Sequence, residues 1–221
     1  MAKVYLSPSD QESNVYAYDN TNEAVQCGRI AEACRAALER SGVEVKVGHM
    51  ISMAQKCSES NAFGADLHVP IHTNAFNGKV MGTRMFCYSA GGKGMAACKA
   101  IFARLAPITP GESENIQVNA DYYEVRVPAA PTAYIECEFH DTVEGAKWIV
   151  ENTTAIGESI ARGICDYFGV AFKEPEQPKP AAGATIYRVQ VGAYTKKENA
   201  ENMLAKLKKD GYSGFIVEGK L

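Results

Sequence analysis

The chain has 221 residues, of which 46% are hydrophobic and 22% are charged, and its 23 basic and 26 acidic residues give a net charge of −3. These proportions are typical of a globular protein with an apolar core and exclude a disordered, collagen-like or fibrous chain. The slightly acidic balance argues against nucleic acid as a partner. No apolar run approaches the ~18 residues that would predict a membrane span. Residues 1–8 lack the apolar core of a signal peptide, so we expect synthesis in the cytoplasm without export by this route.

Strand and helix patterns alternate along the first 170 residues. Alternating or continuous apolar runs predict strands at residues 4–6, 43–47, 66–72, 83–88, 122–127 and 132–138. Helical spacing of apolar residues predicts helices from a cap at Thr21 or Asn22 to Gly42, and at residues 52–63, 93–105 and 143–168. Strands that alternate with helices are typical of an α/β domain. We therefore predict a mostly parallel sheet with helices on both faces.

The composition changes after residue 170. A proline-rich, charged segment predicts a semi-rigid linker. Beyond it we expect a small β-α-β unit, with strands at 186–191 and 215–217 around an amphipathic helix at 195–209. So small a unit buries too little apolar surface to be stable alone and needs a partner surface. The predicted parts are a domain at 1–170, a linker at 171–184 and a module at 185–221.

The seven cysteines are an odd number and include no C-x-x-C pair. In a chain without an export signal, this pattern predicts neither a disulfide framework nor a zinc knuckle or redox pair. We therefore expect the cysteines to be small buried hydrophobic residues.

Two polar windows lie at the ends of predicted strands. In the first, residues 65–75, an apolar strand ends in His-Thr-Asn-Ala, which places His72 at the carboxyl edge of the sheet, where α/β sites are built. His72 is the best metal-ligand candidate. His68 lies ~13 Å further back along the strand, too far to share one ion, and is expected to be a buried structural histidine.

In the second window, residues 131–141, Glu136, Glu138 and His140 share one face of a strand. A glutamate at the depth of Glu136 could act as a general base beside a metal. The alternative is a strand end that becomes polar where it reaches water, which is the expectation for Glu138. The two windows together favour a site.

On these residues the first domain resembles the zinc-dependent N-acetylmuramoyl-L-alanine amidases of the type-3 amidase family, which cleave the amide between muramic acid and the peptide stem of peptidoglycan. The family's His-x-Asn-Ala motif matches residues 72–75, and its Pro-x-x-x-x-Glu-x-x-Phe motif matches residues 131–139. Its helix-borne glutamate ligand matches Glu23. The resemblance implies that Glu23 and His72 hold zinc and that Glu136 is the catalytic glutamate. It leaves Asn74 and His140 as substrate-binding or supporting groups.

The first loop departs from the family pattern. The family opens with Asp-Pro-Gly-His-Gly, whose histidine is the first zinc ligand, whereas residues 7–11 of this chain read Ser-Pro-Ser-Asp-Gln. Asp10 could supply a carboxylate and Gln11 a weaker amide oxygen as the third ligand. We favour Gln11, because the loop resembles a divergent branch reading Ser-Pro-Ser-x-Gln. The alternative is a non-catalytic peptidoglycan-binding protein that kept the fold and lost the metal.

The module at 185–221 resembles the start of a SPOR domain, a peptidoglycan-binding module, on residues 186–194 and the helix that follows. SPOR domains contain two strand-helix-strand halves, and one half is present here. The second half would come from another chain in a homodimer, or the single half would dock on the amidase domain. The resemblance, without a signal peptide, implies a phage or prophage endolysin, or a mother-cell lytic enzyme, that acts on the wall after release.

Overall fold

The computed structural model describes residues 1–114, 116–175, 189–209, 212 and 214–219. It separates two units, Met1–Pro175 and Glu176–Leu221. Most of the predicted linker at 171–184 and the beginning of the predicted strand at 186–191 lie outside the described residues.

The first unit is built on a six-stranded sheet with the order β2-β1-β3-β6-β4-β5. The strands are β1 (Lys3–Pro8), β2 (Glu44–Val47), β3 (Leu67–Asn74), β4 (Arg84–Cys87), β5 (Gln117–Val118) and β6 (Tyr134–Phe139). Neighbouring strands are parallel except for β4, which runs antiparallel to β6. The predicted mostly parallel sheet is therefore confirmed, and β5 is a short strand that the sequence patterns did not predict.

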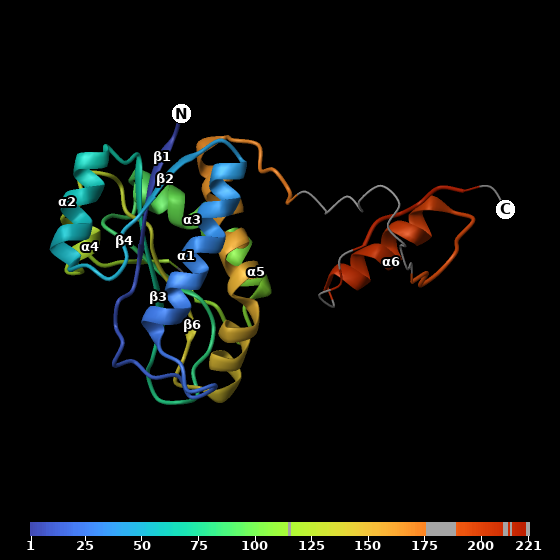
Figure 1. The fold of residues 1–221 in the computed structure, drawn as a ribbon, viewed down its shortest axis with the longest axis horizontal. Helices are drawn as coiled ribbons and strands as arrows, with labels where there is room; N and C mark the ends of the chain where they lie inside the picture. The colour runs from blue at the N-terminus through green and yellow to red at the C-terminus, as the bar shows by residue number, and fades with distance from the viewer. Residues whose placement is uncertain (115, 176–188, 210–211, 213, 220–221) are drawn as a thin grey trace, which may run out of the picture. The chain divides into compact units, whose positions relative to one another are not determined.

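Helices cover both faces of the sheet, as predicted (Figure 1). Helices α1 (Glu23–Arg40), α3 (Lys93–Leu105) and α5 (Val143–Phe168) pack together on one face. Helices α2 (Met53–Phe63) and α4 (Tyr123–Arg126) lie on the other, and a 3-10 turn, η1 (Ala106–Ile108), follows α3. No described helix combines the length and the apolar character that crossing a membrane requires.

The two faces of the sheet differ sharply in polarity. Since side chains alternate along a strand, β3 sends Leu67, Val69 and Ile71 into the apolar core under α1, α3 and α5. The alternate residues face α2 and α4 and include polar groups on each of the three central strands, namely Tyr5, Ser7, His68, His72, Tyr134 and Glu136. The first face therefore stabilises the fold, and the second is free to carry chemistry.

Caps set the ends of the helices close to where the sequence predicted them. The Asn22 side chain accepts a hydrogen bond from the Val25 amide and begins α1, which ends before Gly42 in a left-handed conformation (φ +87°). Ser52 and Gln55 form a capping box at the start of α2. The predicted bounds of α3 and α5 agree with the observed ones.

The prediction of a strand at residues 122–127 is wrong, because this segment contains α4. Its aromatic and β-branched residues favour a strand locally. However, the amides of Val125 and Arg126 both bond to the Tyr122 carbonyl, and the turn points the buried Glu124 at Ser7 and His68. These tertiary contacts override the local propensity.

In the second unit, α6 (Lys197–Lys209) confirms the predicted helix apart from its first two residues. Among the described residues of this unit, neither 189–192 nor 215–217 forms a strand. Val191, Phe215 and Val217 are exposed there. A strand requires a hydrogen-bonded neighbour, so the described part of the first predicted strand and the predicted strand at 215–217 do not form.

Candidate active site

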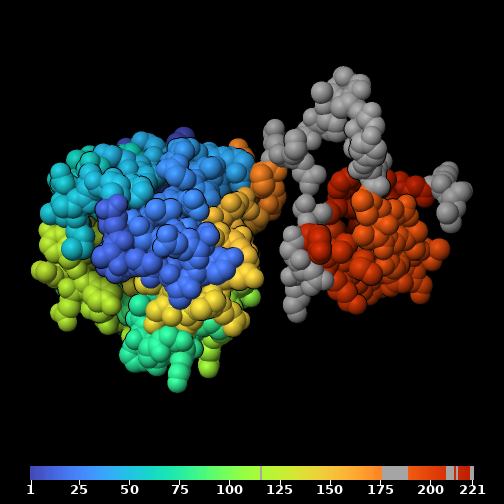
Figure 2. Space-filling view, turned by 60° about the horizontal axis from the view of Figure 1, so that its bottom comes forward, coloured from blue at the N-terminus to red at the C-terminus, as the bar shows by residue number. Residues whose placement is uncertain are grey.

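Three of the predicted site residues meet at the carboxyl edge of the parallel strands. Gln11 lies in the loop after β1, Glu23 begins α1 at the Asn22 cap, and His72 lies two residues before the end of β3. Figure 2 turns this edge towards the viewer, with the first loop and the start of α1 in blue and the loop after β3 in green. The fold therefore brings together residues that are up to 61 positions apart.

The polar ends of these three side chains are within hydrogen-bond range. His72 Nδ1 lies 2.9 Å from Glu23 Oε1 and 3.5 Å from Gln11 Nε2. Asn14 links the other two residues, because its Nδ2 donates to Glu23 Oε2 at 2.6 Å and to Gln11 Oε1 at 3.0 Å. Sequence reasoning missed Asn14, which lies in a polar loop without a recognisable pattern.

Glu23 and His72 form a buried charged pair. Burial alone would raise the pKa of Glu23, but hydrogen bonds from His72, Asn14 and Ser9 hold this pKa below its usual value. Burial would also lower the pKa of His72, but the bond to Glu23 and the nearby charge of Glu136 raise it above its usual value. In the metal-free protein, these shifts favour a charged Glu23 carboxylate beside a protonated His72 imidazole. A metal cation could take the place of this proton between the two groups.

Glu136 lies opposite His72 on the neighbouring strand β6. Its Oε2 is buried and has no hydrogen-bond partner among the described residues, and the same holds for His72 Nε2. Burial raises the pKa of Glu136 to about 8, the charge on His72 opposes this rise, and the charge on Glu23 adds to it. A carboxylate with an unpaired oxygen and a raised pKa has the properties of a general base.

Aromatic rings form one wall of this cluster. The Tyr134 ring stacks on the His72 imidazole, with centroids 4.7 Å apart and planes 17° apart. Tyr122 and Phe86 pack on Tyr134 in turn, with centroid distances of 5.1 and 6.0 Å. This stack fixes the plane of the imidazole.

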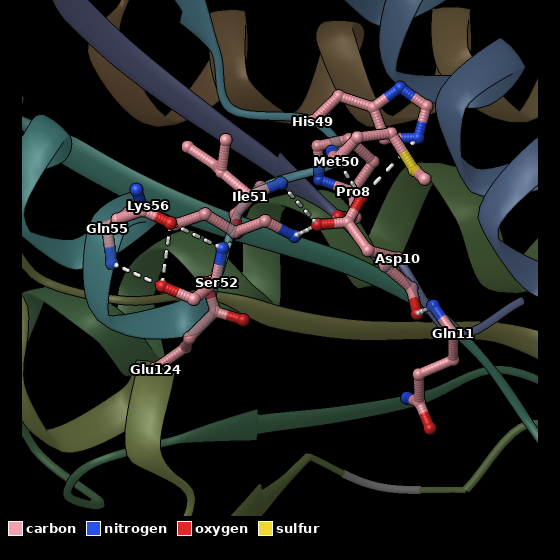
Figure 3. A network of polar contacts seen from close by, with 12 residues as sticks. Pro8, Asp10, Gln11, His49, Met50, Ile51, Ser52, Gln55, Lys56 and Glu124 are labelled. Atoms are coloured by element: carbon pink, nitrogen blue, oxygen red, sulfur yellow. Dashed lines mark hydrogen bonds and ion pairs between the residues drawn. The ribbon is translucent and has the colours of Figure 1, made fainter.

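Asp10, the alternative to Gln11 as a ligand, does not join the cluster (Figure 3). Its carboxylate accepts bonds from the amides of Met50 at 2.7 Å and Ile51 at 3.2 Å, and it lies 2.7 Å from Lys56 Nζ. Lys56 is buried and also donates to the Pro8 carbonyl. Asp10 therefore anchors the first loop to α2, whereas the Gln11 side chain points away from this network.

The remaining polar residues of the two windows bond within the fold. Asn74 Oδ1 accepts from the Ala75 amide, and His140 Nδ1 lies 3.0 Å from Thr73 Oγ1. Burial lowers the pKa of His140. The expectation of a solvated Glu138 is wrong, because it is buried and accepts bonds from the Gly82 amide at 2.8 and 2.9 Å.

His68 is fully buried and its Nε2 lies 3.2 Å from Glu124 Oε1, in agreement with the expected structural histidine. The seven cysteines are buried and free, as predicted.

Comparison with known proteins matches both parts of the chain. A family model described as N-acetylmuramoyl-L-alanine amidase matches residues 9–166, and a model of the SPOR domain matches residues 169–218. Two Bacillus proteins align with 98% of the chain and 85% of their own length. They are the sporulation-specific N-acetylmuramoyl-L-alanine amidase of Bacillus subtilis (strain 168), 24% identical, and the N-acetylmuramoyl-L-alanine amidase CwlM of Bacillus licheniformis, 25% identical.

Solved structures share the fold of the first unit. The catalytic domain of the amidase CwlV from Bacillus (Paenibacillus) polymyxa var. colistinus superposes with a TM-score of 0.69 at 16% identity, over 77% of this chain and 100% of that one. The amidase AmiC2 of Nostoc punctiforme gives a TM-score of 0.67 at 18% identity, over 76% of this chain and 97% of that one.

Proposed function

Because the chain belongs to the N-acetylmuramoyl-L-alanine amidase family, we propose that it uses zinc to hydrolyse the amide between N-acetylmuramic acid and L-alanine in peptidoglycan. The observation that carries this proposal is the meeting of Gln11, Glu23 and His72 beside Glu136 at the carboxyl edge of the sheet.

The donor set fits a zinc ion. Glu23 offers a carboxylate, His72 an imidazole and Gln11 an amide oxygen, from three separate segments. A half-turn of the Gln11 amide about its last bond would turn its oxygen towards His72. Three protein ligands with one open position are the usual plan of a catalytic zinc site, in which the ion polarises a carbonyl and lowers the pKa of water towards ~7.

Glu136 would move the proton of the reaction. Its unpaired Oε2 is available to accept a proton from the attacking water and to return it to the departing L-alanine nitrogen. Burial raises the pKa of Glu136 to about 8 in the metal-free protein, and a bound cation would favour the charged carboxylate that accepts the proton. Asn14 and Tyr134 would act by holding the neighbouring groups in place, Asn14 through Glu23 and Tyr134 through the ring of His72.

We also propose that the SPOR module binds peptidoglycan and that the enzyme acts on the cell wall after release. The relative named a sporulation-specific amidase supports the setting of a mother-cell lytic enzyme. The endolysin role and the homodimer through the C-terminal module stay predictions from the sequence.

Hydrolysis of purified peptidoglycan by Glu136→Gln tests the assignment of the base. We expect a loss of roughly 10²–10⁴-fold in the release of peptide stems. The matched control is Glu151→Gln, which makes the same change at an exposed position of α5 and should leave the rate unchanged. If Glu136→Gln kept the wild-type rate, the assignment would be wrong.

Metal analysis of Gln11→Ala and Asp10→Ala tests the ligand set. We expect Gln11→Ala to lose zinc affinity, and Asp10→Ala to retain zinc while losing stability, because Asp10 is engaged by Lys56. A wild-type protein that hydrolysed no peptidoglycan with zinc in excess would instead support the non-catalytic binder.

A further inference from the structure

A second cluster of metal-ligating side chains lies between the sheet and its smaller layer of helices. Cys57 of α2, His68 of β3 and Glu124 of α4 each offer one donor atom, and these atoms all lie within 4.8 Å of one another. All three side chains are buried. Among the described residues, no other group of His, Cys, Asp or Glu meets this distance criterion.

This cluster is separate from the proposed catalytic site. His68 and His72 lie on one strand four residues apart, which corresponds to roughly 13 Å of strand length. The two sets share no residue, because the catalytic cluster consists of Gln11, Glu23 and His72. A thiol occurs in the second cluster and in no residue proposed for the first.

The spacing of the donor atoms suits an ion after a small closure. Donors held ~2.0–2.3 Å from a tetrahedral zinc ion lie roughly 3.5 Å apart. His68 Nε2 and Glu124 Oε1 are already 3.2 Å apart. Cys57 and Glu124 sit on a helix and a short helical turn that pack against each other. Movement of the Cys57 rotamer or of α4 by about 1 Å would therefore complete the set.

Metal binding in this cluster would be coupled to the loss of a proton. Burial alone would raise the pKa of Glu124, but bonds from His68 and Ser7 hold it below its usual value, so the carboxylate is charged. Burial and the charge on Glu124 raise the pKa of the Cys57 thiol to about 11. The thiol therefore keeps its proton without an ion, and metal binding would release it.

We propose that Cys57, His68 and Glu124 form a second metal site, which takes a divalent ion of the zinc class and is structural. The combination of thiolate, imidazole and carboxylate is typical of zinc ligands. The Ser7 hydroxyl, which donates to Glu124, is the nearest candidate for completing the shell. The proposal stands independently of whether the catalytic cluster binds zinc.

The ion would fasten α4 to the sheet beside the catalytic cluster. α4 is one turn long and begins after Tyr122, whose ring packs on Tyr134. Tyr134 stacks in turn on His72. The ion would therefore position the aromatic wall of the catalytic cluster.

Cobalt substitution distinguishes the two sites because only one contains sulfur. The full chain is stripped of metal by chelation and reloaded with Co²⁺ in steps. We expect a sulfur-to-cobalt charge-transfer band in the near ultraviolet in the wild-type protein and in His72→Ala. The band should disappear in Cys57→Ala and remain in the matched control Cys165→Ala, which removes another buried free thiol.

A wild-type protein that binds cobalt without this band would overturn the proposal, as would a band that persists in Cys57→Ala. X-ray absorption on zinc-loaded His72→Ala covers the case in which Cys57→Ala does not fold. One sulfur scatterer per ion is expected, and a shell without sulfur would refute the site. Failure of the amidase proposal would appear separately, as peptidoglycan hydrolysis that is absent from the wild-type protein.

Discussion

Replacing Glu136 with glutamine should stabilise the metal-free protein, and the gain should grow with pH. The carboxyl has a pKa of about 8 in the folded protein and an ordinary value of 4.5. Between these two values the folded state binds more protons than the unfolded state, so the free energy of unfolding falls as pH rises. Glutamine cannot ionise and avoids this loss.

The size of the effect follows from the two pKa values. Each pH unit between them is worth about 1.4 kcal/mol, so the full interval gives an upper limit of roughly 5 kcal/mol. Glu136 is partly exposed although its Oε2 is buried, and water screens part of the cost. We therefore expect the variant to be more stable than the wild type by roughly 2 kcal/mol above pH 8, relative to the difference near pH 4.5.

Urea unfolding of chelator-treated protein at about pH 5 and about pH 8.5 measures this difference. Glu151→Gln, at an exposed position, should show no pH-dependent gain over the wild type. An equal stability difference between Glu136→Gln and the wild type at both pH values would refute the reasoning. Adding zinc should reduce the gain, because a cation beside Glu136 favours its charged form.

Further predictions concern the first loop, the helix packing and the module. Asp10→Ala should lower the free energy of unfolding in urea by about 3–5 kcal/mol, because it removes the carboxylate that pairs with the buried Lys56 ammonium. Lys56→Met should cost less, since Asp10 keeps its bonds from two backbone amides. Equal losses in the two variants would contradict this account. Gly157→Ala should lower the free energy of unfolding in urea by about 1–3 kcal/mol, because its Cβ would lie 2.6 Å from the Ile30 carbonyl oxygen. In Gly28→Ala the nearest atoms to the new Cβ belong to the His49 side chain, which can move, so this variant should be within ~1 kcal/mol of wild type. A chain ending at residue 175 should hydrolyse soluble muropeptides at the full rate but sediment less with intact peptidoglycan, and unchanged sedimentation would argue against wall binding by the module.

The parts of the fold that could be predicted depend on local signals. Asn22, Ser52 and Gly64 mark helix ends by their own side chains or backbone freedom, so the bounds of α1 and α2 follow closely from the sequence. The carboxyl edge of a parallel sheet gathers the ends of its strands. For this reason, His72 and the loop containing Gln11 could be expected to meet before their distance was known.

The parts that could not be predicted depend on contacts between distant segments. The strand pattern around Glu124 gives way to α4 because Ser7 and His68 hold its carboxylate from another part of the chain. Asp10 looks like a ligand in the sequence, but Lys56 and the turn after β2 engage it. Glu138 has the pattern of a solvated strand end, yet the backbone amide of Gly82 turns towards it.

The unequal polarity of the two sheet faces explains how one small sheet could hold two sites. The face under α1, α3 and α5 is apolar, and its continuous core supplies the stability of the unit. The opposite face is covered by α2 and the single turn α4, so the buried His68 and Glu124 and the half-buried Glu136 cannot rely on a large apolar layer to hold them. Each must then be held by a specific partner. Hydrogen bonds provide the partner for one oxygen of Glu124, whereas His68 Nδ1 and Glu136 Oε2 lack one among the described residues. Glu136 lies beside the catalytic cluster and Glu124 belongs to the second cluster, so both proposed sites are built on the same polar face of the sheet, where buried polar groups depend on specific partners.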